Sequence, residues 1–301
     1  MPTLPTFLLI GAPRCGTTSI YHYLNQHPQV FMSRMKEPHF FTFDGSDQTF
    51  DDANEAAFAR NKIRDLASYQ RLFAGRTDEL AVGEASPGYL HWPGAHERIR
   101  RRLPGVKLLA ILRQPVERAF SEHVRRRHVG KETRSSFEEA FRDDILAVVG
   151  SRSWSGNYRS NGYYHEQLTR YYALFPREQL RVYLFEDLCE DPGGLLQDLF
   201  TFLGVDAGFV PDVSKKHNAT GAIANPLLRL LWNRTYVLRS YMAPFVPIPV
   251  RGYVSNFVDS RKKTRSHARL SPELRRELTA YYRDDIGKLG ELIGRDLSRW
   301  L

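Results

Sequence analysis

The chain has 301 residues, 42% of them hydrophobic, which is enough for a sizeable core and excludes a disordered chain. Its net charge of +9 suits an anionic small molecule, an anionic polymer or a membrane surface, although a solvated basic surface gives the same excess. We expect no signal peptide, no membrane-spanning helix and two reduced cysteines, Cys15 and Cys189, which together favour a cytoplasmic protein.

The first strong pattern is a strand, a glycine loop and a helix near the start of the chain. The apolar run at residues 7–10 predicts a buried strand, and apolar residues recur at helical spacing from Ile20 to Leu24. Gly11 and Gly16, in the loop between them, have the spacing of a phosphate-binding P-loop. This arrangement directs backbone N–H groups and the positive end of a helix toward an anion.

The loop departs from the nucleotide-binding P-loop in its cation. Thr17 stands where that motif has Lys, and the cation is instead Arg14, inside the loop. We therefore expect a phosphate site that does not serve an ordinary ATP or GTP.

A second segment, KEPHFF, places a charged pair beside aromatic residues. Lys36 and Glu37 precede Pro38, which favours an extended or turn conformation for Glu37. Either the pair is functional, or it is a surface ion pair next to two core phenylalanines.

The strongest strand prediction covers residues 106–112, which are apolar on both faces as in a central parallel strand. Arg113 follows directly, at the edge where ligands bind in open α/β sheets, and Ser121 lies two turns into the next helix. A P-loop nucleotide triphosphatase needs an Asp near this position to hold magnesium. Arg113 instead suggests direct contact with a phosphate, with a surface ion pair as the alternative.

Further strands and helices alternate along the chain. Strands are predicted at 29–32, 80–83 and 180–185, and helices at 63–73, 95–103, 137–149, 163–175, 194–203 and from Ser271 onward. The pattern predicts one domain, residues 1–301, with a three-layer α/β fold around a central parallel sheet and a P-loop-like loop.

Two basic or apolar segments have more than one interpretation. Residues 125–135 are a solvated helix end or the rim of a site for an anionic acceptor. Residues 208–268 lack clear alternation, and the apolar stretch 223–249 is a packed helix, a lid, a lipophilic acceptor wall or a membrane-surface segment. A basic loop then runs from Arg261 to Arg269.

Together, GAPRCGTTS, KEPHFF, LRQPVERAFSEH and ELIGRDLSRW resemble the sulfotransferases that use PAPS (3'-phosphoadenosine 5'-phosphosulfate). The chain is most similar to the branch containing heparan sulfate sulfotransferases and their bacterial relatives. Two positions depart from that pattern: Arg14 replaces the usual loop Lys, and Ala85 replaces a Lys that the heparan sulfate branch often carries.

The resemblance implies roles for individual residues of the donor site. The glycine loop binds the 5'-phosphosulfate through Arg14, Cys15, Gly16, Thr17, Thr18 and Ser19. Arg113 and Ser121 bind the 3'-phosphate. The late basic loop adds four candidates without a fixed register: Arg261, Lys262, Lys263 and Arg265.

The resemblance also implies an in-line sulfuryl transfer to a hydroxyl or amine, without a metal, on a carbohydrate, glycolipid or small molecule. Glu37 is the expected base and Lys36 holds or tunes it, with His39 a competing base and His123 a weaker one. Arg14 stabilises developing charge. The alternatives are a magnesium-dependent nucleotide kinase or NTPase and a non-enzymatic module that binds anionic polymers.

Overall fold

The computed structural model describes residues 4–44, 59, 62–128, 131–144, 157–214, 221–223, 262–265 and 270–301. The strands are β1 (Phe7–Gly11), β2 (Val30–Met32), β3 (Ala81–Ala85), β4 (Lys107–Leu112), β5 (Leu180–Leu184), β6 (Gly221–Ile223) and β7 (Lys262–Arg265). The α-helices are α1 (Thr17–Leu24), α2 (Phe40–Phe43), α4 (Leu66–Arg71), α5 (Ala95–Arg102), α6 (Pro115–His128), α7 (Phe137–Asp143), α8 (Tyr164–Tyr172), α9 (Phe185–Glu190), α10 (Pro192–Leu203), α14 (Pro272–Thr279) and α15 (Arg283–Ile293).

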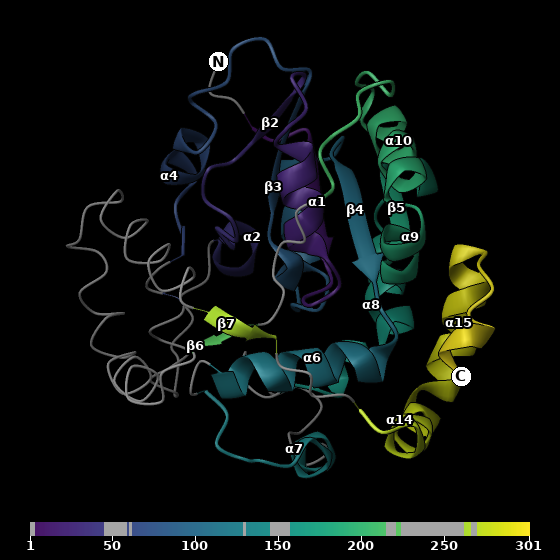
Figure 1. Ribbon diagram of the computed structural model, residues 1–301. Helices are drawn as coiled ribbons and strands as arrows, with labels where there is room; N and C mark the ends of the chain where they lie inside the picture. Colours follow the sequence, from purple (N-terminus) through teal and green to yellow (C-terminus); the bar gives the residue numbers. More distant parts are fainter. Residues whose placement is uncertain are drawn as a thin grey trace.

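The first five strands form one parallel sheet in the order β2-β3-β1-β4-β5, within a three-layer α/β fold (Figure 1). β1 is central: Leu8 pairs with Glu84 of β3 on one side and with Leu108 of β4 on the other. The chain fills the β3 side first and then crosses to β4, so the strand order reverses beside β1. Ligands bind at such a reversal in open α/β sheets, which is where the glycine loop lies.

The core is built around β1 and β4, whose side chains are buried on both faces of the sheet. Residues 7–10 and 108–112 are all at most 1% exposed, as the long apolar runs predict for central parallel strands. Gly83 on β3 makes room for the Phe7 ring, because a Cβ there would lie 2.2 Å from Phe7 Cζ. The tight packing fixes the strand ends from which the site residues project.

The predicted helix beginnings and ends are confirmed where they depend on local caps. Ser271 is the N-cap of α14 and its Oγ accepts the N–H of Leu274, and Gly204 ends α10 with φ 79°. The single C-terminal helix predicted from Ser271 is instead two helices, because a 3-10 turn at Ala280–Tyr282 separates α14 from α15.

Two strand-end predictions are wrong. The strand predicted at residues 80–83 extends through Glu84 and Ala85 as β3, and Glu84 is fully buried, with hydroxyl donors from Tyr69 and Ser86 at its carboxyl. The strand predicted at 180–185 ends at Leu184, because α9 begins at Phe185, and Asp187 Oδ2 of α9 accepts the N–H of Leu184 at 3.0 Å.

Some predictions fall on residues that the structure does not describe. These are residues 224–249 of the apolar stretch, Arg261 and the end of the helix predicted at 137–149. Where a helix was predicted at residues 63–73, the observed helix α4 is shorter and covers Leu66–Arg71. Within the described ranges, no helix is long and apolar enough to span a bilayer.

Candidate active site

The glycine loop joins β1 to α1 and leaves the beginning of the helix open to a ligand. Gly16, the N-cap of α1, has φ 92°, and no side chain caps the helix. A Cβ at Gly16 would lie 2.7 Å from Leu188 Cδ2, so α9 also requires a glycine here. The first N–H groups of a helix have no acceptor in a preceding turn and carry the positive end of its dipole. The loop is therefore suited to an anion.

Arg14 joins the loop to α6. Its Nε donates to Ser121 Oγ at 3.2 Å and lies 3.8 Å from Glu122 Oε2, and its side chain is only 14% exposed. Burial lowers the pKa of Arg14, Glu122 raises it, and the like charges of Arg125 and Arg113 lower it further. The structure thus brings together two residues predicted at the donor site from positions 107 residues apart, and clusters positive charge around them.

Arg113 follows β4 directly, as predicted, and is held by two contacts. Its guanidinium carbon lies 4.8 Å from the ring centre of Phe185, and its terminal nitrogen lies 3.2 Å from Glu117 Oε2. Glu117 is also 3.7 Å from Arg275 Nε of α14. The surface ion pair considered as an alternative therefore exists, at the same strand end that suits a ligand contact.

Cys15 faces the core. Its thiol is fully buried, with Sγ 3.8 Å from the hydroxyl oxygen of Tyr164, and burial raises the pKa of Cys15 to about 11. Its backbone N–H donates to the carbonyl oxygen of Ala12 at 3.3 Å. Cys15 therefore supports the loop from beneath, and the chain has two free thiols, of which Cys189 is exposed.

The second part of the site is the turn at residues 36–39, which we call the Glu37 turn. Lys36 Nζ lies 2.8 Å from Glu37 Oε1, and His39 Nε2 lies 3.8 Å from Glu37 Oε2. The Glu37 side chain is 41% exposed and that of His39 is 1% exposed. Of these two side chains, that of Glu37 is therefore the more accessible to solvent.

Backbone strain marks the same residues. In the part of the chain that the structure describes, the non-glycine residues with positive φ are Arg14 (70°), Glu37 (60°) and His39 (56°). Residues with a Cβ rarely adopt this conformation, and when they do they concentrate at functional sites. All three were singled out by sequence motifs, so the strain independently points to the loop and the turn.

Electrostatics set the ionisation of the Glu37 turn. Burial acts to raise the pKa of Glu37, but the neighbouring His39 side chain and the charges of Lys36 and Lys62 outweigh it and hold the pKa well below its ordinary value. Burial lowers the pKa of His39 to about 4, against the opposing effect of Glu37. At neutral pH the turn therefore presents a partly exposed carboxylate beside a neutral imidazole.

Three residues that sequence reasoning did not place in the site support this turn. Lys62 Nζ donates to the carbonyl oxygen of Glu37 at 2.8 Å, and Ser86 Oγ accepts the N–H of His39 at 3.1 Å. Ser86 Oγ in turn donates to Glu84 Oε2 at 2.8 Å. No sequence motif marks Lys62, because its contact with Glu37 depends on the fold.

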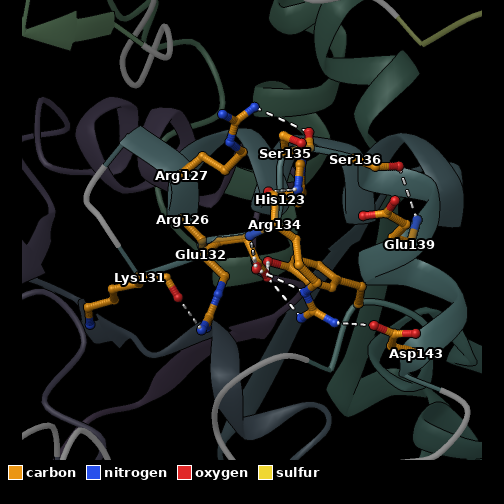
Figure 2. Close-up of polar contacts among 11 residues, drawn as sticks. His123, Arg126, Arg127, Lys131, Glu132, Arg134, Ser135, Ser136, Glu139 and Asp143 are labelled. Atoms are coloured by element: carbon orange, nitrogen blue, oxygen red, sulfur yellow. Dashed lines mark hydrogen bonds and ion pairs between the residues drawn. The ribbon is translucent and has the colours of Figure 1, made fainter.

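The basic segment after α6 folds into a polar network (Figure 2). Arg134 binds Glu132 through Nε at 3.0 Å and a terminal nitrogen at 3.1 Å, and also contacts Asp143 at 2.9 Å. Burial works to raise the pKa of Glu132, but these bonds lower it to about 2. Arg127 donates to the carbonyl oxygen of Ser135 at 3.2 Å. Part of the positive charge therefore fixes the segment to α7.

His123, the weaker base candidate, is 3% exposed and lies inside this network. Its Nε2 is 3.3 Å from the carbonyl oxygen of Arg134, and burial lowers its pKa. The imidazole of His123 is thus buried and in contact with the backbone of this network.

The late basic segment differs from the prediction. Residues 262–265 were expected to form a loop but are strand β7, paired antiparallel with β6. In Figure 1 these two strands lie at the end of the sheet toward which the β4 arrow points, near α6. The candidates Lys262, Lys263 and Arg265 thus belong to β7, and Arg261 lies outside the described residues. The described residues contain no cluster of His, Cys, Asp or Glu arranged to hold a metal.

Comparison with curated proteins finds relatives along nearly the whole chain. Mouse bifunctional heparan sulfate N-deacetylase/N-sulfotransferase 4 is 24% identical over 99% of this chain, and mouse heparan sulfate glucosamine 3-O-sulfotransferase 3A1 is 25% identical over 98% of it. The chain spans only 31% of the first of these relatives and 64% of the second.

A solved structure and a family model agree with these relatives. The sulfotransferase from Alicyclobacillus acidocaldarius is 32% identical, with a TM-score of 0.73 and 99% of each chain covered. Residues 5–209, which contain the glycine loop, the Glu37 turn, Arg113 and Ser121, match the model of the Sulfotransferase family. The chain therefore belongs to the sulfotransferase family.

Proposed function

We propose that this sulfotransferase uses PAPS as donor and transfers its sulfuryl group to a hydroxyl or amine of an acceptor, with Glu37 as the base. The observation that carries the proposal is that the glycine loop and the Glu37 turn both lie at the carboxyl ends of the central strands. The uncapped beginning of α1 with Arg14 and Ser121 suits the anionic donor, and the exposed carboxylate of Glu37 suits the acceptor.

The donor side fits a ligand with two separated anionic groups. The N–H groups at the beginning of α1 and the guanidinium of Arg14 would bind the phosphosulfate, as at other helix beginnings. Arg113 and Ser121, on β4's end and α6, would bind the 3'-phosphate. The cation–π contact with Phe185, at 4.8 Å, holds the guanidinium of Arg113 at this strand end, and a guanidinium offers forked N–H donors to phosphate oxygens.

On the acceptor side, Glu37 would take the proton that the attacking hydroxyl or amine loses as the new S–O or S–N bond forms. The leaving group is adenosine 3',5'-bisphosphate, whose phosphate takes the electron pair of the broken S–O bond. Its low pKa makes Glu37 a weak base, so its contribution to catalysis depends on how closely its carboxylate is positioned to the attacking group. The contact with Lys36 at 2.8 Å fixes one carboxylate oxygen and leaves the other toward His39.

The acceptor class stays open among carbohydrates, glycolipids and hydroxylated small molecules. The names of the relatives mention heparan sulfate, which supports a carbohydrate. Ala85 lacks the cation that the heparan sulfate branch often has, and the apolar stretch 223–249 favours a lipophilic or mixed acceptor that approaches from a membrane surface.

The test is transfer of label from ³⁵S-PAPS to a panel of these acceptors, without magnesium. In Glu37→Gln we expect turnover to fall by about 100-fold, because a carboxamide cannot take the proton. Glu97→Gln, at an exposed glutamate of α5, serves as the matched control and should keep full turnover. Transfer from ATP in place of PAPS would support a kinase, and near-normal turnover of Glu37→Gln would remove Glu37 as the base.

A further inference from the structure

A short segment far along the chain is fixed to the Glu37 turn by two bonds. Lys62 Nζ donates to the carbonyl oxygen of Glu37 at 2.8 Å, and the N–H of Ile63 donates to the carbonyl oxygen of Pro38 at 3.0 Å. Neither bond belongs to a helix or strand. Both contacts are between residues 25 positions apart, so they position the segment against the turn rather than continue a local structure.

The Glu37 turn needs such support because its backbone is strained. Glu37 has φ 60° although it carries a side chain, a conformation that costs roughly 1 kcal/mol or more and persists only where neighbours hold it. Its N–H donates to the carbonyl oxygen of Ala85 at 2.9 Å, at the end of β3. Its own carbonyl oxygen accepts from Lys62. The two backbone groups of Glu37 are thus held from two different parts of the chain.

The bond from Lys62 is also electrostatic. A hydrogen bond from an ammonium to a carbonyl is about twice as strong as one between neutral groups. The charged groups that act on Lys62 are Glu37 and Glu84, which stabilise its ammonium, and Lys36 and Lys131, which oppose it. Burial is the largest effect and lowers the pKa of Lys62 to about 8. The ammonium also acts on Glu37, whose pKa it helps to lower.

We propose that Lys62 is a positioning residue for sulfuryl transfer, whose ammonium holds the Glu37 turn in its strained conformation. The inference rests on the proposed role of Glu37 as the base. Lys36 binds the carboxylate itself, whereas Lys62 binds the backbone beneath it. Residues 62 and 63 therefore stabilise the turn by donating hydrogen bonds to its backbone carbonyl oxygens.

Two substitutions separate charge from shape. Lys62→Met keeps a similar length without the ammonium or its hydrogen bond, and Lys62→Arg keeps a positive charge and N–H donors. Lys288→Met is the matched control, because Lys288 is a half-exposed lysine of α15 whose ammonium lies 2.7 Å from Asp284. Binding of adenosine 3',5'-bisphosphate to each variant, measured by calorimetry, reports whether the donor side is intact.

The test that does not need an acceptor is a ¹³C NMR titration of the Glu37 carboxyl, assigned by its loss in Glu37→Gln. Removal of a nearby cation raises the pKa of a carboxyl, so in Lys62→Met the Glu37 titration should move to higher pH by about one pH unit. It should stay in place in Lys62→Arg and Lys288→Met. An unmoved titration in Lys62→Met would overturn the proposal, whatever the outcome of the transfer assay.

Turnover with the best acceptor completes the test. We expect kcat of Lys62→Met to fall about tenfold at neutral pH, with the dissociation constant for adenosine 3',5'-bisphosphate within about twofold of wild type, and Lys62→Arg to restore most of the loss. Equal losses in both variants, or a parallel loss of bisphosphate binding, would show a merely structural role and overturn the inference. If the wild-type protein itself transfers no sulfuryl group, the proposed function fails. The titration of Glu37 would still show whether the Lys62 ammonium acts on the Glu37 turn.

Discussion

Glu84 offers a prediction whose magnitude follows from its surroundings. It is fully buried on β3, where Ser86 Oγ donates to Oε2 at 2.8 Å and the hydroxyl of Tyr69 donates to Oε1 at 3.4 Å. Burial raises the pKa of Glu84 to about 7; the hydroxyl donors oppose this effect, and the nearby charge of Glu37 adds to it. The substitution Glu84→Gln keeps the size of the side chain and removes its titration.

The sign of the effect follows from proton binding. In the unfolded chain a glutamate has a pKa near 4.5, whereas in the folded protein Glu84 has a pKa of about 7. Between these values the folded state binds more protons, so the stability that Glu84 contributes is present below about pH 4.5 and is lost as the pH rises through 7. A displacement of this size corresponds to about 3 kcal/mol of unfolding free energy.

The assay is urea unfolding of wild type, Glu84→Gln and the exposed control Glu97→Gln at several values from about pH 4.5 to about pH 8. Glu84→Gln should become more stable relative to wild type by about 3 kcal/mol across this range, on top of a constant cost for its altered hydrogen bonds. Glu97→Gln should follow wild type. A constant difference between wild type and Glu84→Gln would refute the reasoning, because it would mean that Glu84 does not titrate in this interval.

Three further predictions concern the donor side. Arg113→Ala should weaken binding of adenosine 3',5'-bisphosphate by roughly tenfold or more in calorimetry, and an unchanged dissociation constant would remove Arg113 from the 3'-phosphate site. Gly16→Ala should lower the unfolding free energy by about 2 kcal/mol in urea, through its positive φ and a clash with Leu188, and unaltered stability would contradict that packing. With a thiol reagent at neutral pH, exposed Cys189 should react fast and buried Cys15 only on unfolding; two fast thiols would contradict the core position of Cys15.

Local patterns made the framework of the site predictable. The apolar runs at 7–10 and 106–112, bounded by Gly and Pro, indicated buried parallel strands, and their carboxyl ends had to meet at one edge. Arg14 and Ser121 follow those strands in the sequence, so their contact is a consequence of the sheet order. The resemblance to sulfotransferases rested on the same segments, and family membership is confirmed.

The parts that could not be predicted depend on tertiary contacts. A glutamate at a strand end is ordinarily exposed, and Glu84 is buried only because Ser86 and Tyr69 direct hydroxyl groups at it. Lys62 belongs to no motif, and its place beneath Glu37 depends on a fold-back of 25 residues. Likewise, the basic segment 125–135 was interpreted as a solvated helix end or an acceptor rim, whereas Arg134 pairs its charge with Glu132.

The central claim is that the glycine loop and the end of β4 bind a nucleotide with both 5'- and 3'-anions. Calorimetric titration of the protein without magnesium should show binding of adenosine 3',5'-bisphosphate at least roughly tenfold tighter than 5'-AMP, which lacks the 3'-phosphate. That difference should vanish in Arg113→Ala. Tighter binding of Mg·ATP than of the bisphosphate, or equal binding of the bisphosphate and 5'-AMP, would contradict the proposed donor.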